Sequence, residues 1–260
     1  MTDLIAITGA TGHLGGGVAR GLHERGRPLR LVVRDPSRAP DLAGAALAMA
    51  SYDDPDALRR AFEGVDTLFL VSAAEAQDRL AQHRTAVRAA AEAGVRRVVY
   101  TSFLGAAPDA AFTLARDHFH TEQALTDAGL AHVALRNSLY ADVVPAFVTD
   151  GVLRGPGGAG HLAPVARRDV VDVSVAALED PTLTGPLALT GPVLHDLAEI
   201  AAVTGEVTGD ATRYVAETVR RPTRRGAGTA RPTGSSTHGS APTSRSPPAS
   251  WTWSPTRSNG

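Results

Sequence analysis

The chain of 260 residues has no cysteine, no lysine and no long apolar run. Without cysteine it can form no disulfide framework and offers no thiol nucleophile. No apolar segment approaches the roughly 20 residues of a membrane-spanning helix. The N-terminus has neither the basic region nor the apolar core of a signal peptide. We therefore expect a cytoplasmic protein with no membrane span.

Acidic residues are absent from the last part of the chain. Residues 1–219 carry 19 arginines and 27 acidic residues, whereas residues 220–260 carry seven arginines and no acidic residue. This last segment also has no Leu, Ile, Val, Phe, Met or Tyr, so it cannot bury enough apolar surface to fold alone. It lacks the folded scaffold and the periodic basic face of a nucleic-acid-binding module. We expect a disordered basic tail with no nucleic-acid partner.

A shift of reading frame explains the composition of this tail. Codons for R-R-P-T-R-R at residues 220–225 can be chosen so that a one-base shift gives E-E-A-Y-A-S, the start of an amphipathic helix. Codons for residues 245–259 can likewise be chosen so that the other frame restores acidic and aliphatic residues. Two such matches in an arginine-rich, lysine-free chain favour a frameshift product. We then expect the preceding lobe to be incomplete and to expose apolar surface.

Glycine is concentrated in residues 7–22, which are ITGATGHLGGGVARGL. Three of these glycines lie three residues apart, between an apolar run and the start of a helical pattern. Glycines let a pyrophosphate approach the backbone, and the first N–H groups of a helix bind it. A plain structural turn is the alternative, but the position between a strand and a helix favours a dinucleotide site. We assign to this site Gly9, Thr11, Gly12, His13, Leu14 and Gly15.

Strands and helices alternate along the body of the chain. Apolar runs predict buried parallel strands at residues 4–7, 29–33, 45–50, 67–71, 95–100 and 132–135. Helical patterns lie between them at residues 13–25, 55–62, 76–93 and 112–128. This alternation predicts an α/β fold with a doubly wound parallel sheet, the Rossmann fold, over residues 1–135. Strands near residues 163, 187–189 and 212–215, with helices near 170–179 and 194–203, predict a small substrate-side lobe over residues 136–219.

Six segments, in this order, resemble the NmrA-like branch of the atypical short-chain dehydrogenases. They are ITGATGHLG, VVRDPSRA, YDDPDALRRAFEGVDTLFLVSA, QHRTAVRAAAEAGVRRVVYTS, HFHTEQALTDAGL and LRNSLYAD. Within that branch the chain is most similar to the type 2 NAD(P)H:quinone oxidoreductases and the triphenylmethane reductases. The resemblance covers residues 4–219 and implies NADP(H) binding with hydride transfer to quinones or similar conjugated acceptors. The family also includes non-catalytic members that bind the dinucleotide as redox sensors.

Arg34 follows the second predicted strand, in the region that selects between the two nicotinamide cofactors. Proteins selective for NAD place an acidic residue there to bind the ribose 2′-OH, whereas arginine suits the 2′-phosphate of NADP. The alternative is a solvated arginine paired with Asp35. Asp53, at the end of the third strand, resembles the position that contacts the adenine amino group. Alternatively, it shares in capping the next helix with Asp54.

Small residues follow the fourth and fifth predicted strands, at the carboxyl edge of the sheet where open α/β folds bind ligands. Ser72 and Ala73 would let the cofactor lie across the strand ends. Thr101 and Ser102 would lie beside the nicotinamide, or else they cap the next segment.

Ordinary short-chain dehydrogenases use a Tyr-x-x-x-Lys pair, and the resemblance places Leu114 and His118 at these two positions. Because the chain has no lysine, the strong proton donor that reduces an isolated ketone is missing. A quinone or a cationic dye gives a delocalised or neutral product and needs little general-acid help. His118 either orients ribose hydroxyls or relays a proton, or it is a satisfied histidine on the helix surface. No histidines have metal-ligand spacing, so we expect no metal.

Asn137 and Tyr140 follow the sixth strand and resemble the loop that flanks nicotinamide and substrate, with Ser138 where close relatives have glycine. Alternatively, Tyr140 packs against the second lobe. We predict an NADPH-dependent reductase of a small quinone-like acceptor, with His118, Ser102 and Tyr140 as catalytic candidates. The alternative is a non-catalytic redox sensor, and for either protein a homodimer is the assembly to be tested.

Overall fold

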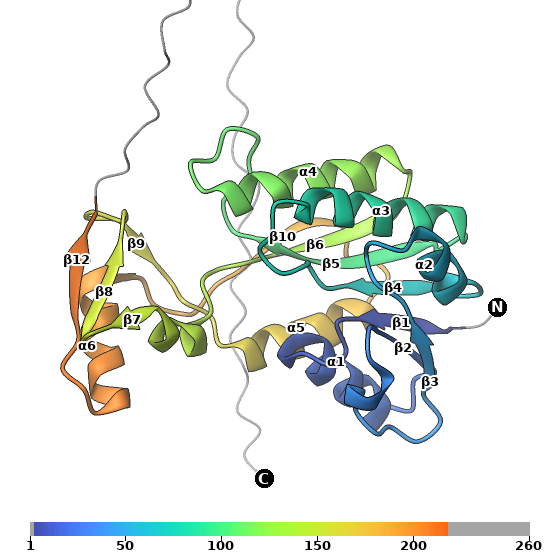
Figure 1. Ribbon diagram of the computed structural model, residues 1–260, viewed down its shortest axis with the longest axis horizontal. Coiled ribbons are helices and arrows are strands. Elements are labelled where there is room, and N and C mark those ends of the chain that lie inside the picture. The colour runs from blue at the N-terminus through green and yellow to red at the C-terminus, as the bar shows by residue number, and fades with distance from the viewer. Residues whose placement is uncertain (1–2, 218–260) are drawn as a thin grey trace, which may run out of the picture.

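The computed structural model describes residues 3–217, in which a seven-stranded parallel sheet has the order β10-β6-β5-β4-β1-β2-β3 (Figure 1). The strands are β1 (Ile5–Thr8), β2 (Leu29–Val33), β3 (Ala46–Met49), β4 (Thr67–Leu70), β5 (Arg97–Phe103), β6 (Ala131–Asn137) and β10 (Gly185–Leu189). The strand order reverses between β1 and β4, so the predicted doubly wound Rossmann fold is confirmed. The predicted disorder of residues 220–260 lies outside the described residues.

Helices cover both faces of the sheet. On one face lie α1 (His13–Glu24) and α5 (Arg167–Glu179), and on the other lie α2 (Pro55–Phe62), α3 (Arg79–Glu92) and α4 (Thr113–Asp127) (Figure 1). Side chains alternate between the two layers along each strand, so that Ile5 and Ile7 join the core under α1 and Ala6 joins the core under α2 and α3. Gly17 lets α1 approach α5 closely, because an added Cβ would lie 2.7 Å from Val171.

The prediction that all six strands are buried is wrong for β3. This strand pairs with β2 and forms one edge of the sheet, where the side chain of Leu47 is 52% and that of Met49 is 68% exposed. An apolar run by itself does not distinguish an edge strand from a central one.

Two elements predicted for the second lobe belong to the main domain instead, one as a strand of its sheet and one as a helix on its face. The strand expected at residues 187–189 is β10, which pairs in parallel with β6, and the helix expected at residues 170–179 is α5, which packs on α1. Without β10, the edge of β6 would be unpaired. The sheet therefore continues beyond residue 135, and the crossover through α5 returns the chain to it.

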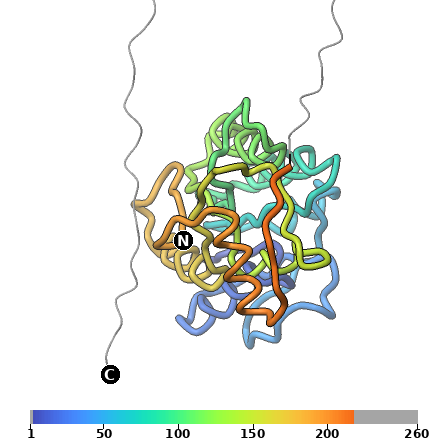
Figure 2. The backbone as a smooth tube through the Cα atoms, turned by 90° about the vertical axis from the view of Figure 1, so that its left-hand side faces the viewer, coloured from blue at the N-terminus to red at the C-terminus, as the bar shows by residue number. Residues whose placement is uncertain are grey.

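The small lobe lies beyond the carboxyl ends of the strands, nearest the viewer in Figure 2. Its elements are η2 (Ala141–Phe147), β7 (Val148–Thr149), β8 (Val152–Gly155), β9 (His161–Leu162), β11 (His195–Asp196), α6 (Leu197–Thr208) and β12 (Arg213–Ala216). Val144, Leu153 and Ile200 are central to its own core. Two apolar side chains of this part of the chain are largely exposed, Leu194 at 67% and Val207 at 78%. That the lobe is incomplete stays a prediction.

Candidate functional site

The turn between β1 and α1 is formed by glycines. Gly9 has a φ of +63°, a conformation that favours glycine. An added Cβ on Gly15 would lie 2.6 Å from the carbonyl carbon of Gly9, so no larger residue fits there. Gly12 is the N-cap of α1, and no side chain within residues 3–217 caps the helix, which leaves the first N–H groups available to an anion. The turn therefore holds the start of α1 close to β1 and presents N–H donors that suit a pyrophosphate.

A cavity of about 330 Å³ lies beside this turn at the carboxyl edge of the sheet. Residues from the ends of four strands line it, although they are far apart in the sequence. The predicted cofactor residues in its lining are Gly9, Thr11, Arg34, Asp53, Ser72 and Ala73. The other predicted cofactor residues are outside the lining, namely Gly12, His13, Leu14, Gly15, Thr101 and Asn137. Of the latter, the first four belong to the glycine turn and the start of α1.

Arg34 is an exposed side chain on the wall of this cavity. The alternative partner proposed for it, Asp35, is engaged elsewhere: its carboxylate accepts hydrogen bonds from the N–H and hydroxyl of Ser37, at 3.0 and 2.7 Å, at the start of η1 (Pro36–Arg38). These bonds hold the pKa of Asp35 below its usual value. Within residues 3–217 no ion pair or hydrogen bond engages the Arg34 guanidinium, so it is available to a ligand.

Asp53 and Asp54 have separate tasks. Asp54 alone caps α2, because its carboxylate accepts from the N–H of Ala57 at 2.9 Å. The alternative in which Asp53 shares the cap is therefore wrong. Asp53 instead accepts a hydrogen bond from the side-chain amide of Gln82 at 3.0 Å, and both line the cavity. Gln82, on α3, has no local sequence signal that marks it as a site residue.

The backbone that follows β4 is held by side chains from several elements. The Val71 N–H donates to Thr8 Oγ1 at 2.9 Å, and the Val71 carbonyl accepts from the hydroxyl of Tyr52 at 2.6 Å. The Ser72 N–H donates to Thr101 Oγ1 at 2.8 Å, so Thr101 supports this loop rather than capping the segment after its own strand. Burial raises the pKa of Tyr52, which therefore acts as a neutral hydroxyl. No local sequence signal marks Thr8 or Tyr52 as a site residue.

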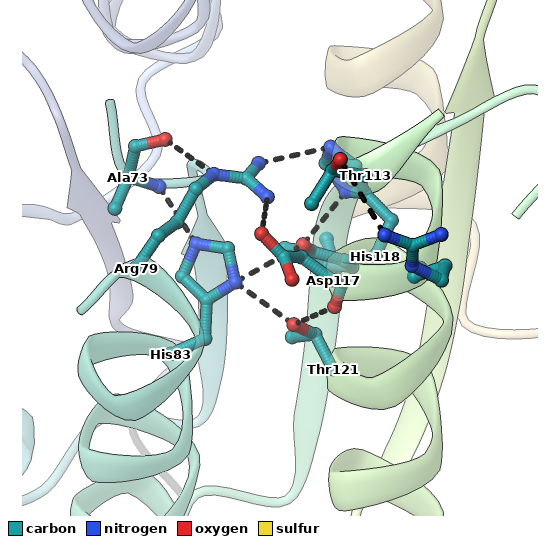
Figure 3. A network of polar contacts seen from close by, with 9 residues as sticks. Ala73, Arg79, His83, Thr113, Asp117, His118 and Thr121 are labelled. Atoms are coloured by element: carbon teal, nitrogen blue, oxygen red, sulfur yellow. Dashed lines mark hydrogen bonds and ion pairs between the residues drawn. The ribbon is translucent and has the colours of Figure 1, made fainter. Parts of the chain in front are cut away.

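Ala73, the next residue, is held at both of its backbone polar groups by α3 (Figure 3). Its N–H donates to His83 Nε2 at 2.8 Å, and its carbonyl accepts from Arg79 Nε at 2.9 Å. The side chain of Arg79 is only 3% exposed and also approaches Asp117 at 3.5 Å.

His118, predicted as a catalytic residue, belongs to the same network and is buried between α4 and the sheet. Its Nε2 accepts from Arg79 Nη2 at 2.9 Å, and its Nδ1 lies 2.8 Å from the hydroxyl of Tyr100. Arginine can only donate, so Nε2 carries no proton and Nδ1 is the protonated nitrogen. The same reasoning gives His83 a proton on Nδ1, which donates to Thr121 Oγ1 at 2.8 Å.

Both histidine rings are therefore neutral. Burial, together with the charge of Arg79, lowers the pKa of His83 to about 3 and that of His118 to about 2. The prediction that His118 relays a proton near neutral pH is wrong. A protonated Nε2 would be a donor that faces the N–H donor of Arg79 Nη2. The alternative of a histidine on the helix surface is also wrong, since His118 is 5% exposed. Sequence spacing does not show that an arginine 39 residues away contacts this ring.

Acid should destabilise the fold through these two rings. An unfolded histidine binds a proton below about pH 6.5, but the folded rings do not, so their contribution is complete above that pH and is lost as the pH falls. At pH 5 each ring should lower the unfolding free energy by about 2 kcal/mol relative to pH 7.5. Urea denaturation at both pH values measures the change. A double variant, His83→Gln with His118→Gln, should lose about 4 kcal/mol less than the unaltered chain; an equal loss would contradict neutral buried rings.

Ser102, also predicted to be catalytic, does not line the cavity beside the glycine turn. Its hydroxyl donates to the Glu122 carboxylate at 2.5 Å, and Arg136 donates to the same carboxylate at 3.0 and 2.6 Å. Ser102 is 3% exposed. The proton of this hydroxyl is therefore committed to a buried structural contact, and Ser102 is not placed to serve an acceptor.

Asn137 and Tyr140 lie together after β6. The Asn137 side-chain amide donates to the Tyr140 hydroxyl at 3.0 Å, and the Asn137 Oδ1 is buried with no partner within residues 3–217. Tyr140 packs against the core of the main sheet rather than only against the lobe, and it pairs through its backbone with Val165. Burial raises its pKa, so its hydroxyl keeps its proton. Within the described part of the chain that O–H has no acceptor.

No group of three or more His, Asp or Glu side chains within residues 3–217 is arranged to hold a metal ion. Among the helices of the same residues, none has the length and apolar character to cross a membrane.

Two curated proteins are similar to this chain over most of its length. Quinone oxidoreductase 2 of Escherichia coli is 34% identical over 220 residues, which are 81% of this chain and 77% of that protein. The NAD(P)H azoreductase of Xenophilus azovorans is 30% identical over 231 residues, which are 84% and 78% of the two chains.

Two solved structures are also similar to this chain. The NADPH complex of the Escherichia coli NADPH-dependent quinone oxidoreductase matches with a TM-score of 0.72 at 33% identity, covering 82% of this chain and 78% of that one. The NADP(H) complex of the Citrobacter sp. triphenylmethane reductase matches with a TM-score of 0.70 at 28% identity, covering 82% and 79%. A family model described as NAD(P)H-binding matches residues 9–181. The chain, with its glycine turn and adjoining cavity, thus belongs to this NAD(P)H-binding family.

Proposed function

We propose that the protein is an NADPH-dependent reductase that transfers a hydride to a quinone or a similar conjugated acceptor. The observation that carries this proposal is the glycine turn at the start of α1, which adjoins a cavity with the exposed side chain of Arg34 on its wall. The similar quinone, azo-dye and triphenylmethane reductases support the class of acceptor.

The residues present fit NADPH. The uncapped start of α1, with Gly12, His13, Leu14 and Gly15, would hold the pyrophosphate. Arg34 would pair with the 2′-phosphate, and Asp53 would accept from the adenine amino group. Gly15 lets the start of α1 pack closely against the turn after β1, and the adjoining cavity of about 330 Å³ offers room for such a ligand.

The nicotinamide end would lie toward the ends of β5 and β6. Asn137 has a buried Oδ1 there with no partner within residues 3–217, which suits the carboxamide of the nicotinamide. When bound, NADPH supplies the hydride. Of the three catalytic residues predicted from the sequence, Tyr140 is the one that keeps a hydroxyl proton with no acceptor in residues 3–217, and we propose it as the weak proton donor. His118 and Ser102 are assigned supporting contacts only.

A dinucleotide-sensing protein without chemistry of its own is the second candidate. One observation favours it: His118, at the position of the usual catalytic lysine, is buried and has both ring nitrogens occupied. Turnover of acceptors decides between the two functions. The cytoplasmic location, the homodimer and the frameshift origin of the tail stay predictions.

Selectivity for NADPH over NADH should depend on Arg34. Arg34→Ala removes a charge-assisted contact with the 2′-phosphate, which should cost about 1.5–3 kcal/mol. The Kd for NADPH, measured by fluorescence titration, should then rise roughly 10- to 150-fold, while the Kd for NADH stays nearly the same.

Arg88→Ala is the matched control, because it removes an exposed arginine of α3 that does not line the cavity. It should leave both Kd values unchanged. An equal loss of NADPH and NADH binding in Arg34→Ala, or a preference of the unaltered chain for NADH, would refute the assignment of Arg34.

A further inference from the structure

The loop after β4 is held in place by side chains from several other elements. Residues 71–73 follow the end of the strand, and side chains bond each of them: Thr8 and Tyr52 bond Val71, and Thr101 bonds Ser72. At Ala73 both backbone polar groups are taken by α3, the N–H by His83 and the carbonyl by Arg79. The same loop forms a wall of the cavity that contains Arg34 and Asp53.

We propose that Arg79 and His83 are positioning residues for the dinucleotide, which clamp Ala73 so that the loop after β4 keeps the shape that the bound cofactor requires. The proposal rests on the proposed function, since it assigns these residues to the same cofactor site. Neither residue lines the cavity, and both side chains are buried. They act through the backbone of Ala73.

The geometry fixes the state that the clamp requires. His83 can accept from Ala73 only if Nε2 is unprotonated, and its Nδ1–H donates to Thr121 Oγ1 at 2.8 Å. This bond from His83 to Thr121 ties α3 to α4. Thr121 in turn donates to the carbonyl of Asp117, one turn earlier in α4, at 2.8 Å. Figure 3 shows Ala73 at one side of this network and α4 at the other.

Arg79 bonds His118 directly and is linked to His83 through the backbone of Ala73. Its Nε bonds Ala73, its Nη2 bonds His118 Nε2, and its Nη1 lies near Asp117. The groups that face the two rings are Arg79 from α3, Tyr100 from β5, and Asp117 and Thr121 from α4, with Tyr52 edge-on to His83. The buried guanidinium thus bonds one ring, and its positive charge opposes protonation of both.

Binding of NADPH to clamp variants of the full chain tests the proposal. Arg79→Met and His83→Leu should each raise the Kd for NADPH by roughly tenfold or more. Part of the binding free energy of the cofactor would then be used to order the loop. At saturating NADPH, kcat should change less than about threefold. His83→Gln, which keeps an acceptor oxygen near the position of Nε2, should restore the Kd to within about threefold of the unaltered chain.

Arg97→Met is the control for simple destabilisation. Arg97 is also buried and also holds a loop by its carbonyls, those of Asp180 and Leu183, but it lies at the amino end of β5, at the opposite edge of the sheet. This variant should lower the unfolding free energy and leave the Kd for NADPH unchanged. Amide exchange at residues 71–74 should quicken in Arg79→Met and His83→Leu but not in Arg97→Met.

The outcomes separate the two claims. If the unaltered chain binds no NADPH, the proposed function is wrong and the inference falls with it. If the unaltered chain binds NADPH and both clamp variants bind it equally well, the inference alone is wrong. The same conclusion follows if Arg97→Met weakens binding as much as Arg79→Met, or if His83→Gln behaves like His83→Leu.

Discussion

Replacing Gly15 with alanine should abolish detectable NADPH binding, a loss of more than about 100-fold. The added Cβ would lie 2.8 Å from the carbonyl oxygen of Thr8 and 2.6 Å from the carbonyl carbon of Gly9, and it would be closer still to the Gly9 oxygen. All of these are backbone atoms, which cannot move aside as a flexible side chain can. The start of α1 must therefore shift away from β1, and its N–H groups lose the pyrophosphate.

Unfolding measurements distinguish this local effect from loss of the fold. Overpacking of this kind should cost about 1–3 kcal/mol of stability, so the variant should still fold. Gly155→Ala is the matched control, because its Cβ would meet no atom within 4 Å, and it should change neither binding nor stability appreciably. NADPH binding that survives in Gly15→Ala would show that the pyrophosphate does not lie at this turn.

Acceptor chemistry should show the second large effect. Para-quinones should be reduced, whereas isolated ketones and simple secondary alcohols should turn over at least about 1000-fold more slowly. The chain has no lysine, His118 cannot take a proton, and the hydroxyl of Ser102 is bound to Glu122. Initial rates with NADPH, or with NADP⁺ for the alcohols, measure the difference.

Two variants refine this prediction. Tyr140→Phe removes the proposed weak donor and should slow quinone reduction without abolishing it, because a delocalised product tolerates solvent as the proton source. His118→Ala should likewise slow it only in part. Rapid oxidation of an unactivated alcohol would show that a strong acid–base group is present that these assignments miss.

The fold was largely predictable because local patterns determine most of it. Alternating apolar runs and helical patterns, with Asp54 as an N-cap and glycines after α3 and α4, place the strands and helices of the first half within a few residues of those observed. The pattern does not place β10, in which only Leu189 is buried, in the main sheet, and it does not place β3 at an edge. Which strand lies at an edge depends on partners distant in the sequence.

The site was predictable where the motif is contiguous. The glycine turn lies in one short segment, and Arg34, Asp53, Ser72 and Ala73 follow successive strands, so the parallel sheet brings them to one edge. The network of Arg79, His83 and His118 had no such signal, because its members come from two helices and bond across 39 residues. The hydrogen-bond partners of His118, rather than its residue type, decide whether the ring binds a proton near neutral pH or serves only as a structural contact.

The most direct test of the central claim is hydride transfer measured in the absence of oxygen. Purified full-length chain would be mixed with NADPH deuterated at the transferable position of the nicotinamide and with a para-quinone, and NADP⁺ and hydroquinone would be quantified together. The proposed function predicts one hydroquinone per NADPH oxidised, with a slower rate for the deuterated cofactor if hydride transfer limits turnover. Tight NADPH binding with no oxidation by any quinone of a broad panel would contradict the reductase and favour the redox sensor.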